Sequence, residues 1–130
     1  MFRYLSLDWI DAVREAVAAS ESMRDLSATH DIGVTQVVTG GPEGTVLYHL
    51  QVGDETVSFA AGPAPREHVR LEQSWETAVG VATSNVAAQD ALLKGLVKIT
   101  GDTVRLLESA PVFAALDHAF ESVRESTVYE

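Results

Sequence analysis

Cysteine is absent from the 130-residue chain, and residues with a positive charge are few. Without cysteine the chain can form no disulfide, no thiolate nucleophile and no cysteine-ligated metal or iron–sulfur site. The 9 Lys and Arg residues stand against 19 Asp and Glu residues, which gives a net charge of −10. Such a charge repels phosphate backbones and anionic lipid surfaces. We therefore expect no nucleic-acid partner and at most transient contact with a membrane.

Long hydrophobic runs are also missing. No segment approaches the roughly 18 apolar residues of a membrane-spanning helix, and Asp8 interrupts the N-terminal segment before a signal-peptide core can develop. The length and the 46% hydrophobic content predict one globular domain over residues 1–130. Seven of the nine basic residues are Arg, a bias typical of GC-rich bacterial genes. These features indicate a bacterial, cytoplasmic protein.

Motifs of the common enzyme classes are absent as well. The chain has no Gly-x-Ser-x-Gly elbow, no Walker A loop, no Gly-x-Gly-x-x-Gly and no His-Glu-x-x-His. The glycine-rich segment 40–44 joins two predicted strands and does not open a helix, so it is not expected to bind phosphate. The four histidines fall in separate elements. We therefore expect no catalytic residue, no cofactor and no metal.

Hydrophobic periodicity predicts an α+β domain. A helix begins after Ser6 or Asp8 and runs to about residue 28, and later helices end in an amphipathic segment that Pro111 interrupts or restarts. Gly53-Asp54 is interpreted as a two-residue hairpin turn. Ser74 is the expected N-cap of a central helix over 75–82, and a second short helix starts at 84 or 85 and ends at 94. The predicted strands cover residues 34–39, 46–52, 56–61, 67–72 and 96–100.

Two polar side chains lie within apolar strand faces. Tyr48 shares a face with Leu50, so its hydroxyl points into an apolar layer and needs a partner. Gln36 lies between Val34 and Val38 on one strand face. If the layer above the sheet encloses a cavity, Gln36 and Tyr48 are its polar points. Alternatively, Tyr48 is a core residue whose hydroxyl bonds to the backbone.

The segment from Glu67 to Asp102 carries a distinctive order of elements. An alternating strand precedes two short helices that end in Leu93-Lys94-Gly95, and Leu96-Val97-Lys98-Ile99-Thr100-Gly101-Asp102 follows. This order resembles the sterol carrier protein 2 (sterol transfer) family, over about residues 6 to 124. The resemblance departs from the family in two places: no peroxisomal Ser-Lys-Leu ends the chain, and Pro111 breaks a terminal helix that is often continuous.

The resemblance implies a five-stranded, mostly antiparallel sheet covered on one face by helices, with a hydrophobic tunnel between the layers. It also implies a stand-alone bacterial member that acts as a non-catalytic carrier of a fatty acid, acyl-CoA, phospholipid or sterol. Gln36 and Tyr48 are the candidates for binding the polar head group. The predicted lining consists of Tyr48, Leu50, Phe59, Val69, Trp75, Val79, Leu92, Leu106, Leu107, Phe113, Leu116 and Phe120.

Two alternatives from other classes stay open. The same lining residues can fill a solid core, and the chain is then an interaction or dimerisation module, for instance a homodimer. The second alternative is a small isomerase or cyclase that acts on an apolar polyketide or steroid, with Tyr48 and a carboxylate as acid and base. That enzyme needs a buried carboxylate facing Tyr48, and no Asp or Glu lies at a predicted inward strand position.

Overall fold

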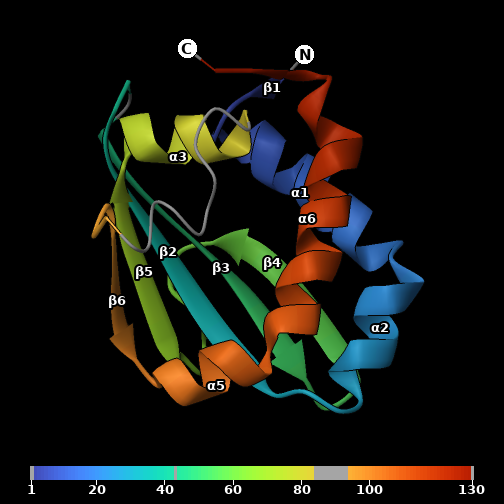
Figure 1. The fold of residues 1–130 in the computed structure, drawn as a ribbon. Helices are drawn as coiled ribbons and strands as arrows, with labels where there is room; N and C mark the ends of the chain where they lie inside the picture. Colours follow the sequence, from blue (N-terminus) through green and yellow to red (C-terminus); the bar gives the residue numbers. More distant parts are fainter. Residues whose placement is uncertain (1, 43, 84–93, 130) are drawn as a thin grey trace.

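A five-stranded sheet forms the centre of the molecule (Figure 1). The computed structural model describes residues 2–42, 44–83 and 94–129. The strands lie side by side in the order β4-β3-β2-β5-β6. Three of the four neighbouring pairs are antiparallel, and β2 and β5 run parallel. The predicted mostly antiparallel sheet is therefore confirmed. Its strands are β2 (Ile32–Gly41), β3 (Gly44–Gly53), β4 (Thr56–Ala61), β5 (Val69–Ser74) and β6 (Val97–Gly101).

The turn between β3 and β4 lies one residue later than the sequence predicts. Gly53 pairs with Thr56 across the hairpin, so Asp54 and Glu55 are the two turn residues. Both have positive φ angles, 50° and 61°. Positive φ at both central positions is the conformation that continues the right-handed twist of the strands. The prediction of Gly53-Asp54 was wrong because Gly53 still belongs to the ladder.

The N-terminal helical region consists of two helices where the sequence predicts one. They are α1 (Leu7–Ala18) and α2 (Glu21–Ser27). Ser20 separates them, because its backbone is extended and its hydroxyl accepts a hydrogen bond from the Met23 amide at 3.2 Å. A serine that bonds to a following amide ends one helix and begins the next. Ser6 caps α1 in the same way, as predicted.

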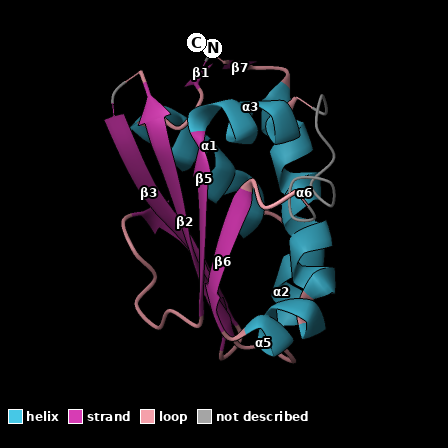
Figure 2. Cartoon of the chain, turned by 60° about the vertical axis from the view of Figure 1, so that its left-hand side comes forward, coloured by secondary structure: helices cyan, strands magenta, loops and turns pink. Residues whose placement is uncertain are grey.

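The remaining helices lie on the same side of the sheet as α1 and α2 (Figure 2). Ser74 caps α3 (Trp75–Ala82), as predicted, and Asp102 caps α5 (Thr103–Glu108). Pro111 lies in the first turn of α6 (Ala110–Arg124), where its missing N–H costs nothing. The short helix predicted to end at residue 94 falls on 84–93, outside the described residues. The helical layer thus covers one face of the sheet.

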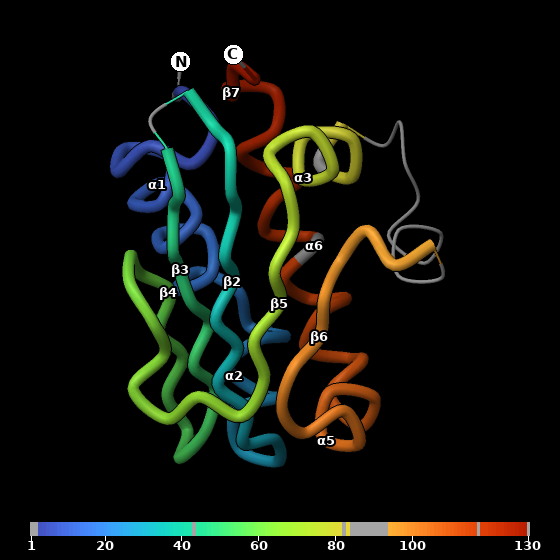
Figure 3. Tube along the Cα trace, turned by 90° about the vertical axis from the view of Figure 1, so that its left-hand side faces the viewer, coloured from blue at the N-terminus to red at the C-terminus, as the bar shows by residue number. Residues whose placement is uncertain are grey.

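The opposite face of the sheet is partly covered by the loop 62–68, which crosses β3 and β2 (Figure 3). Thr35 on β2 is fully buried there, and its hydroxyl accepts a hydrogen bond from the Ala64 amide at 3.0 Å. The apolar core lies between the sheet and the helices and includes Ile10, Val13 and Val34. Among the described residues, no helix is long and apolar enough to span a membrane.

Two very short strands join the ends of the chain. β1 (Phe2–Arg3) pairs in parallel with β7 (Thr127–Val128), and the Tyr4 amide donates to the Val128 carbonyl at 2.9 Å. The N- and C-terminal segments consequently lie side by side at one end of the molecule (Figure 1). No sequence pattern predicted this pair. It brings Tyr4 and Tyr129 together, with ring centroids 5.0 Å apart.

Candidate ligand-binding site

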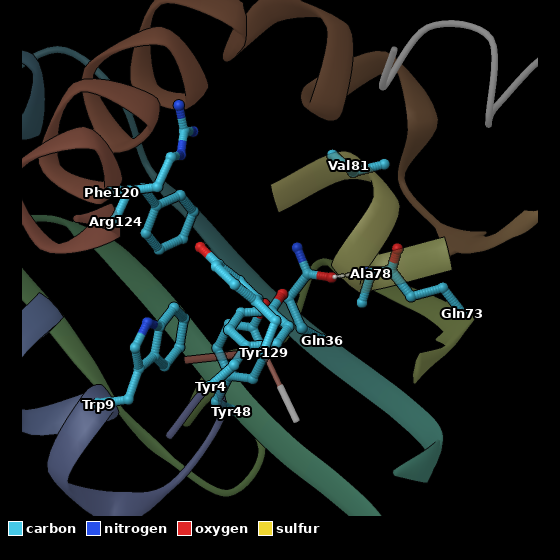
Figure 4. Close-up of a pocket in the computed structure, with 10 residues that line it drawn as sticks. All are labelled: Tyr4, Trp9, Gln36, Tyr48, Gln73, Ala78, Val81, Phe120, Arg124 and Tyr129. Carbon is cyan, nitrogen blue, oxygen red and sulfur yellow. Dashed lines mark hydrogen bonds between the residues drawn. The ribbon is translucent and has the colours of Figure 1, made fainter. Parts of the chain in front are cut away.

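A pocket of about 150 Å³ lies between the helical layer and the helix-covered face of the sheet (Figure 4). Its walls come from the two chain ends, α1, β2, β3, β5, α3 and α6. The pocket therefore exists only when segments from all parts of the chain have come together. Its described lining residues are Tyr4, Trp9, Gln36, Tyr48, Gln73, Ala78, Val81, Phe120, Arg124 and Tyr129.

Aromatic rings form one wall of the pocket. The Trp9 ring lies at the centre of this wall, with its centroid 5.0 Å from Tyr4, 5.8 Å from Phe120 and 5.9 Å from Tyr48. Phe120 stacks on Trp9, whereas Tyr4 and Tyr48 meet Trp9 edge to face. Both geometries are favoured between rings, so the wall is held in place by its own contacts. The result is a rigid apolar surface from helices α1 and α6 and strand β3.

Polar groups form the sheet side of the pocket. Gln36 on β2 lies directly opposite Tyr48 on β3 in the antiparallel ladder. In the parallel ladder, Gln36 pairs with Leu71 and Val38 pairs with Gln73, so the two glutamines are diagonal neighbours on one face. The Gln73 side-chain amide donates to the Gln36 side-chain oxygen at 3.2 Å. We call Gln36, Tyr48 and Gln73 the inner polar set.

The tyrosine hydroxyls of the pocket are neutral. Tyr48 is only 5% exposed, and burial raises the pKa of its phenol well above the usual range. Burial also raises the pKa of Tyr4, and the nearby Tyr48 and Tyr129 add to the increase. A phenol with a raised pKa keeps its proton at neutral pH, so these groups remain hydrogen-bond donors.

The rim of the pocket carries one positive charge among the described lining residues, that of Arg124 near the end of α6. Burial raises the pKa of Tyr129, and Arg124 opposes the increase through its charge and a hydrogen bond. Figure 4 shows the Arg124 guanidinium directed away from Gln36 and Tyr48. No Asp or Glu is among the described lining residues.

Known structures share this arrangement of elements. A crystal structure of sterol carrier protein 2 aligns with 94% of this chain and 98% of its own, with a TM-score of 0.66 and 20% identity. A conserved hypothetical protein from Thermus thermophilus, described as a possible sterol carrier protein, aligns over 95% of this chain and 89% of its own, with a TM-score of 0.67 and 19% identity. The chain has the sterol carrier protein 2 fold.

Two further structures also match this fold. A sterol carrier protein 2-like protein from Aedes aegypti, solved in palmitated form, aligns over 86% of this chain and 90% of its own at a TM-score of 0.56 and 15% identity. A sec-alkylsulfatase from a Pseudomonas species matches 72% of this chain with only 14% of its own length, at a TM-score of 0.51 and 22% identity. No protein-family model and no curated protein sequence matches the chain.

The sterol carrier protein 2 fold brings three of the predicted site residues into the pocket, namely Gln36, Tyr48 and Phe120. Trp75 instead lines a second space, of about 20 Å³, together with Tyr4. Val79, Leu106 and Phe113 are partly buried and pack against the core. Leu92 lies outside the described residues. Four predicted residues are buried in the core without being among the pocket's lining residues: Leu50, Phe59, Val69 and Leu116.

The prediction was wrong for Leu107. Its side chain is 76% exposed on α5, and Val104, one turn earlier, is 62% exposed. The six-residue helix α5 follows β6 and leaves both residues on its outer face. Leu106, the neighbour of Leu107, is the residue that packs against the core. Adjacent residues are about 100° apart around a helix, and in α5 Leu106 takes the inner position while Leu107 faces outward.

Seven of the described pocket residues were not predicted from the sequence. One carried a usable signal, because Trp9 lies four residues before Val13 and eight before Val17 on the apolar stripe of α1. Arg124 follows the apolar Val123 at the end of α6 with no distinguishing pattern. Tyr4 and Tyr129 reach the pocket through the two-residue strands, which are too short to show periodicity. The missed residues are Tyr4, Trp9, Gln73, Ala78, Val81, Arg124 and Tyr129.

Proposed function

We propose that this chain is a member of the sterol carrier protein 2 family and a non-catalytic carrier that binds a small apolar ligand. The observation that supports the proposal is the aromatic-lined pocket between the helical layer and the sheet. Apolar pockets with a few convergent polar groups are the usual form of small-molecule sites. The palmitated Aedes aegypti protein with the same fold adds support for a lipid ligand.

The size of the pocket restricts which part of a lipid it holds. Its volume of about 150 Å³ is close to that of a cavity known to admit benzene and lies below the roughly 300 Å³ at which drug-sized sites begin. A ring or a few carbon atoms therefore fit inside. A fatty acid, acyl-CoA, phospholipid or sterol would extend beyond it, along the tunnel that we propose between the helices and the sheet.

Burial of apolar surface would supply most of the affinity. Each methylene group removed from water contributes about 0.8 kcal/mol, so ten carbons contribute about 8 kcal/mol before the costs of ordering. An affinity of this origin depends weakly on salt. The net charge of −10 would keep contact with anionic membranes transient. We assign the carrier to a bacterial cytoplasm, in keeping with the cysteine-free composition.

The two alternatives have less support. An isomerase or cyclase needs a carboxylate base near Tyr48, and the described lining residues include no Asp or Glu. The raised pKa of Tyr48 also makes its phenolate scarce at neutral pH. A dimerisation module needs a filled interior, whereas this interior holds a pocket. Val104 and Leu107 are the residues on which a homodimer contact would be sought.

Native mass spectrometry of freshly purified protein tests the proposal directly, because a co-purified lipid would add its mass to the chain. Binding of a fluorescent fatty acid should then be compared between two variants. Val81→Trp places an indole at the pocket wall and should abolish binding. Val104→Trp places the same indole on the exposed face of α5 and should leave binding unchanged. Equal affinities of the two variants would refute the carrier proposal.

A further inference from the structure

The inner polar set places polar groups on the helix-covered face of the sheet, where Tyr48 is buried and Gln36 and Gln73 are partly buried. Gln36, Tyr48 and Gln73 come from three adjacent strands and line the same pocket. Their side chains converge from the sheet side, opposite the stacked rings of Trp9 and Phe120 (Figure 4). A buried polar group without a hydrogen bond costs free energy. The question is therefore which donors and acceptors of the inner polar set have a hydrogen-bond partner.

Some donors of the inner polar set face the pocket without a hydrogen-bond acceptor in the described part of the chain. Within the set, the Gln73 amide donates to the Gln36 side-chain oxygen. Both N–H groups of Gln36 and the hydroxyl of Tyr48 have no acceptor among the described residues. The Gln73 side-chain oxygen likewise has no donor among the described residues. A ligand oxygen placed here would satisfy donors that the protein itself leaves unmatched.

Charge decides which kind of oxygen fits. The inner polar set contains no cation, and Arg124, the cation at the rim, points away from it (Figure 4). A carboxylate buried against neutral donors would lose its hydration without gaining an ion pair, which is costly. The net charge of −10 adds a further repulsion against any anion. A hydroxyl, ketone or ester oxygen avoids both costs.

We propose that the pocket recognises a neutral oxygen group of its apolar ligand, a hydroxyl, ketone or ester, at Gln36, Tyr48 and Gln73. This inference rests on the proposed function and adds the polarity and the orientation of the ligand. The oxygen end is buried against β2, β3 and β5, and the apolar remainder lies along the aromatic wall. Ligands that are fully ionised at neutral pH are bound less tightly than their neutral counterparts.

Matched ligands of equal length test the inference. Decanol, methyl decanoate and decanoate should each displace a fluorescent apolar probe at about pH 8, where a carboxylic acid is ionised. Decanol and the ester should bind at least about tenfold more tightly than decanoate, because burying the unpaired charge costs more than 1.4 kcal/mol. Decanoate binding as tightly as decanol, or more tightly, would overturn the inference and would leave the carrier function standing.

Two variants locate the recognition. Tyr48→Phe and Gln36→Leu should each weaken decanol binding by about two- to tenfold, the effect of one lost hydrogen bond. Gln51→Leu removes a glutamine on the opposite face of β3, outside the described lining of the pocket, and should change decanol binding less than twofold. Thermal unfolding would verify that each variant is folded. Unchanged decanol affinity in folded Tyr48→Phe and Gln36→Leu would refute the assignment, and failure of all three ligands to displace the probe would refute the carrier function as well.

Discussion

Phe120 and Phe59 are in contact, and only Phe120 lines the pocket, which makes the pair a quantitative test of the site. Phe59 is 2% exposed and is enclosed by Trp9, Tyr48 and Phe120. Phe59→Ala removes a fully buried ring and leaves a closed void, so we expect a loss of about 3 to 5 kcal/mol in the free energy of unfolding. The ring centroids of Phe59 and Phe120 are 6.2 Å apart, so both report on one region of the core.

Phe120→Ala should cost less. The ring stacks on Trp9 on one side, and the space it vacates is continuous with the existing pocket. The variant loses the free energy of transferring the ring from water into the core, about 1.5 to 3 kcal/mol, but no new closed void forms. Urea unfolding at 25 °C, read by the fluorescence of the two tryptophans, measures both variants. The difference between them should be about 2 kcal/mol.

Binding data on the same two proteins complete the test. The larger pocket of Phe120→Ala should shift ligand preference toward bulkier chains, whereas Phe59→Ala should not. If Phe120→Ala costs as much as Phe59→Ala and leaves ligand preference unchanged, Phe120 is ordinary core. The pocket that the structure shows would then have no part in binding.

Three other predictions concern stability. Glu55→Gly should raise the free energy of unfolding by about 1 kcal/mol, because φ is 61° at Glu55 and glycine adopts that conformation without strain. Urea unfolding measures the change, and a destabilised variant would contradict the turn geometry. Ser74→Ala should lower it by about 1 kcal/mol, whereas Ser74→Asp retains the cap of α3 and should match the wild type. The Glu67 carboxylate has a lowered pKa, first through the Thr35 hydroxyl and then through Arg70. Its contribution to stability is present above the unfolded-state pKa near 4.5 and is lost as the pH falls through the lower folded-state value, so Glu67→Gln should show a smaller loss of stability between about pH 5 and pH 3.

The strands of the sheet were predictable because they carry local signals, whereas their order in the sheet was not predicted. The β-branched run 34–39 identifies β2, and the alternation in 46–52 identifies β3. Ser74 predicts the start of α3, and the structure has the same N-cap. The break at Ser20 was not predictable from periodicity, since small residues on both sides continue the helical pattern. Only the hydrogen bond from the Met23 amide to the Ser20 hydroxyl shows that the chain changes direction there.

The pocket was predictable only in part. Gln36 and Tyr48 stood out as polar residues on apolar strand faces, and the β2–β3 register places them directly opposite each other. Leu50 and Val69 were assigned to the lining because sequence alone does not separate a core position from a pocket wall. Tyr4 and Tyr129 could not be found, since their place depends on a contact between the two ends of the chain.

That contact has a consequence for folding kinetics. The β1–β7 pair closes a loop of nearly the whole chain, and the entropy cost of closure rises with loop length. Two residues on each strand contribute few hydrogen bonds and little buried surface to offset this cost. The pair should therefore form after the β2–β3 hairpin and the core have formed. The opening that exposes the Tyr4 amide should therefore cost less free energy than the opening that exposes the amides of β2, so the Tyr4 amide hydrogen should exchange faster. The part of the pocket that Tyr4 and Tyr129 line should therefore form late in folding and open early.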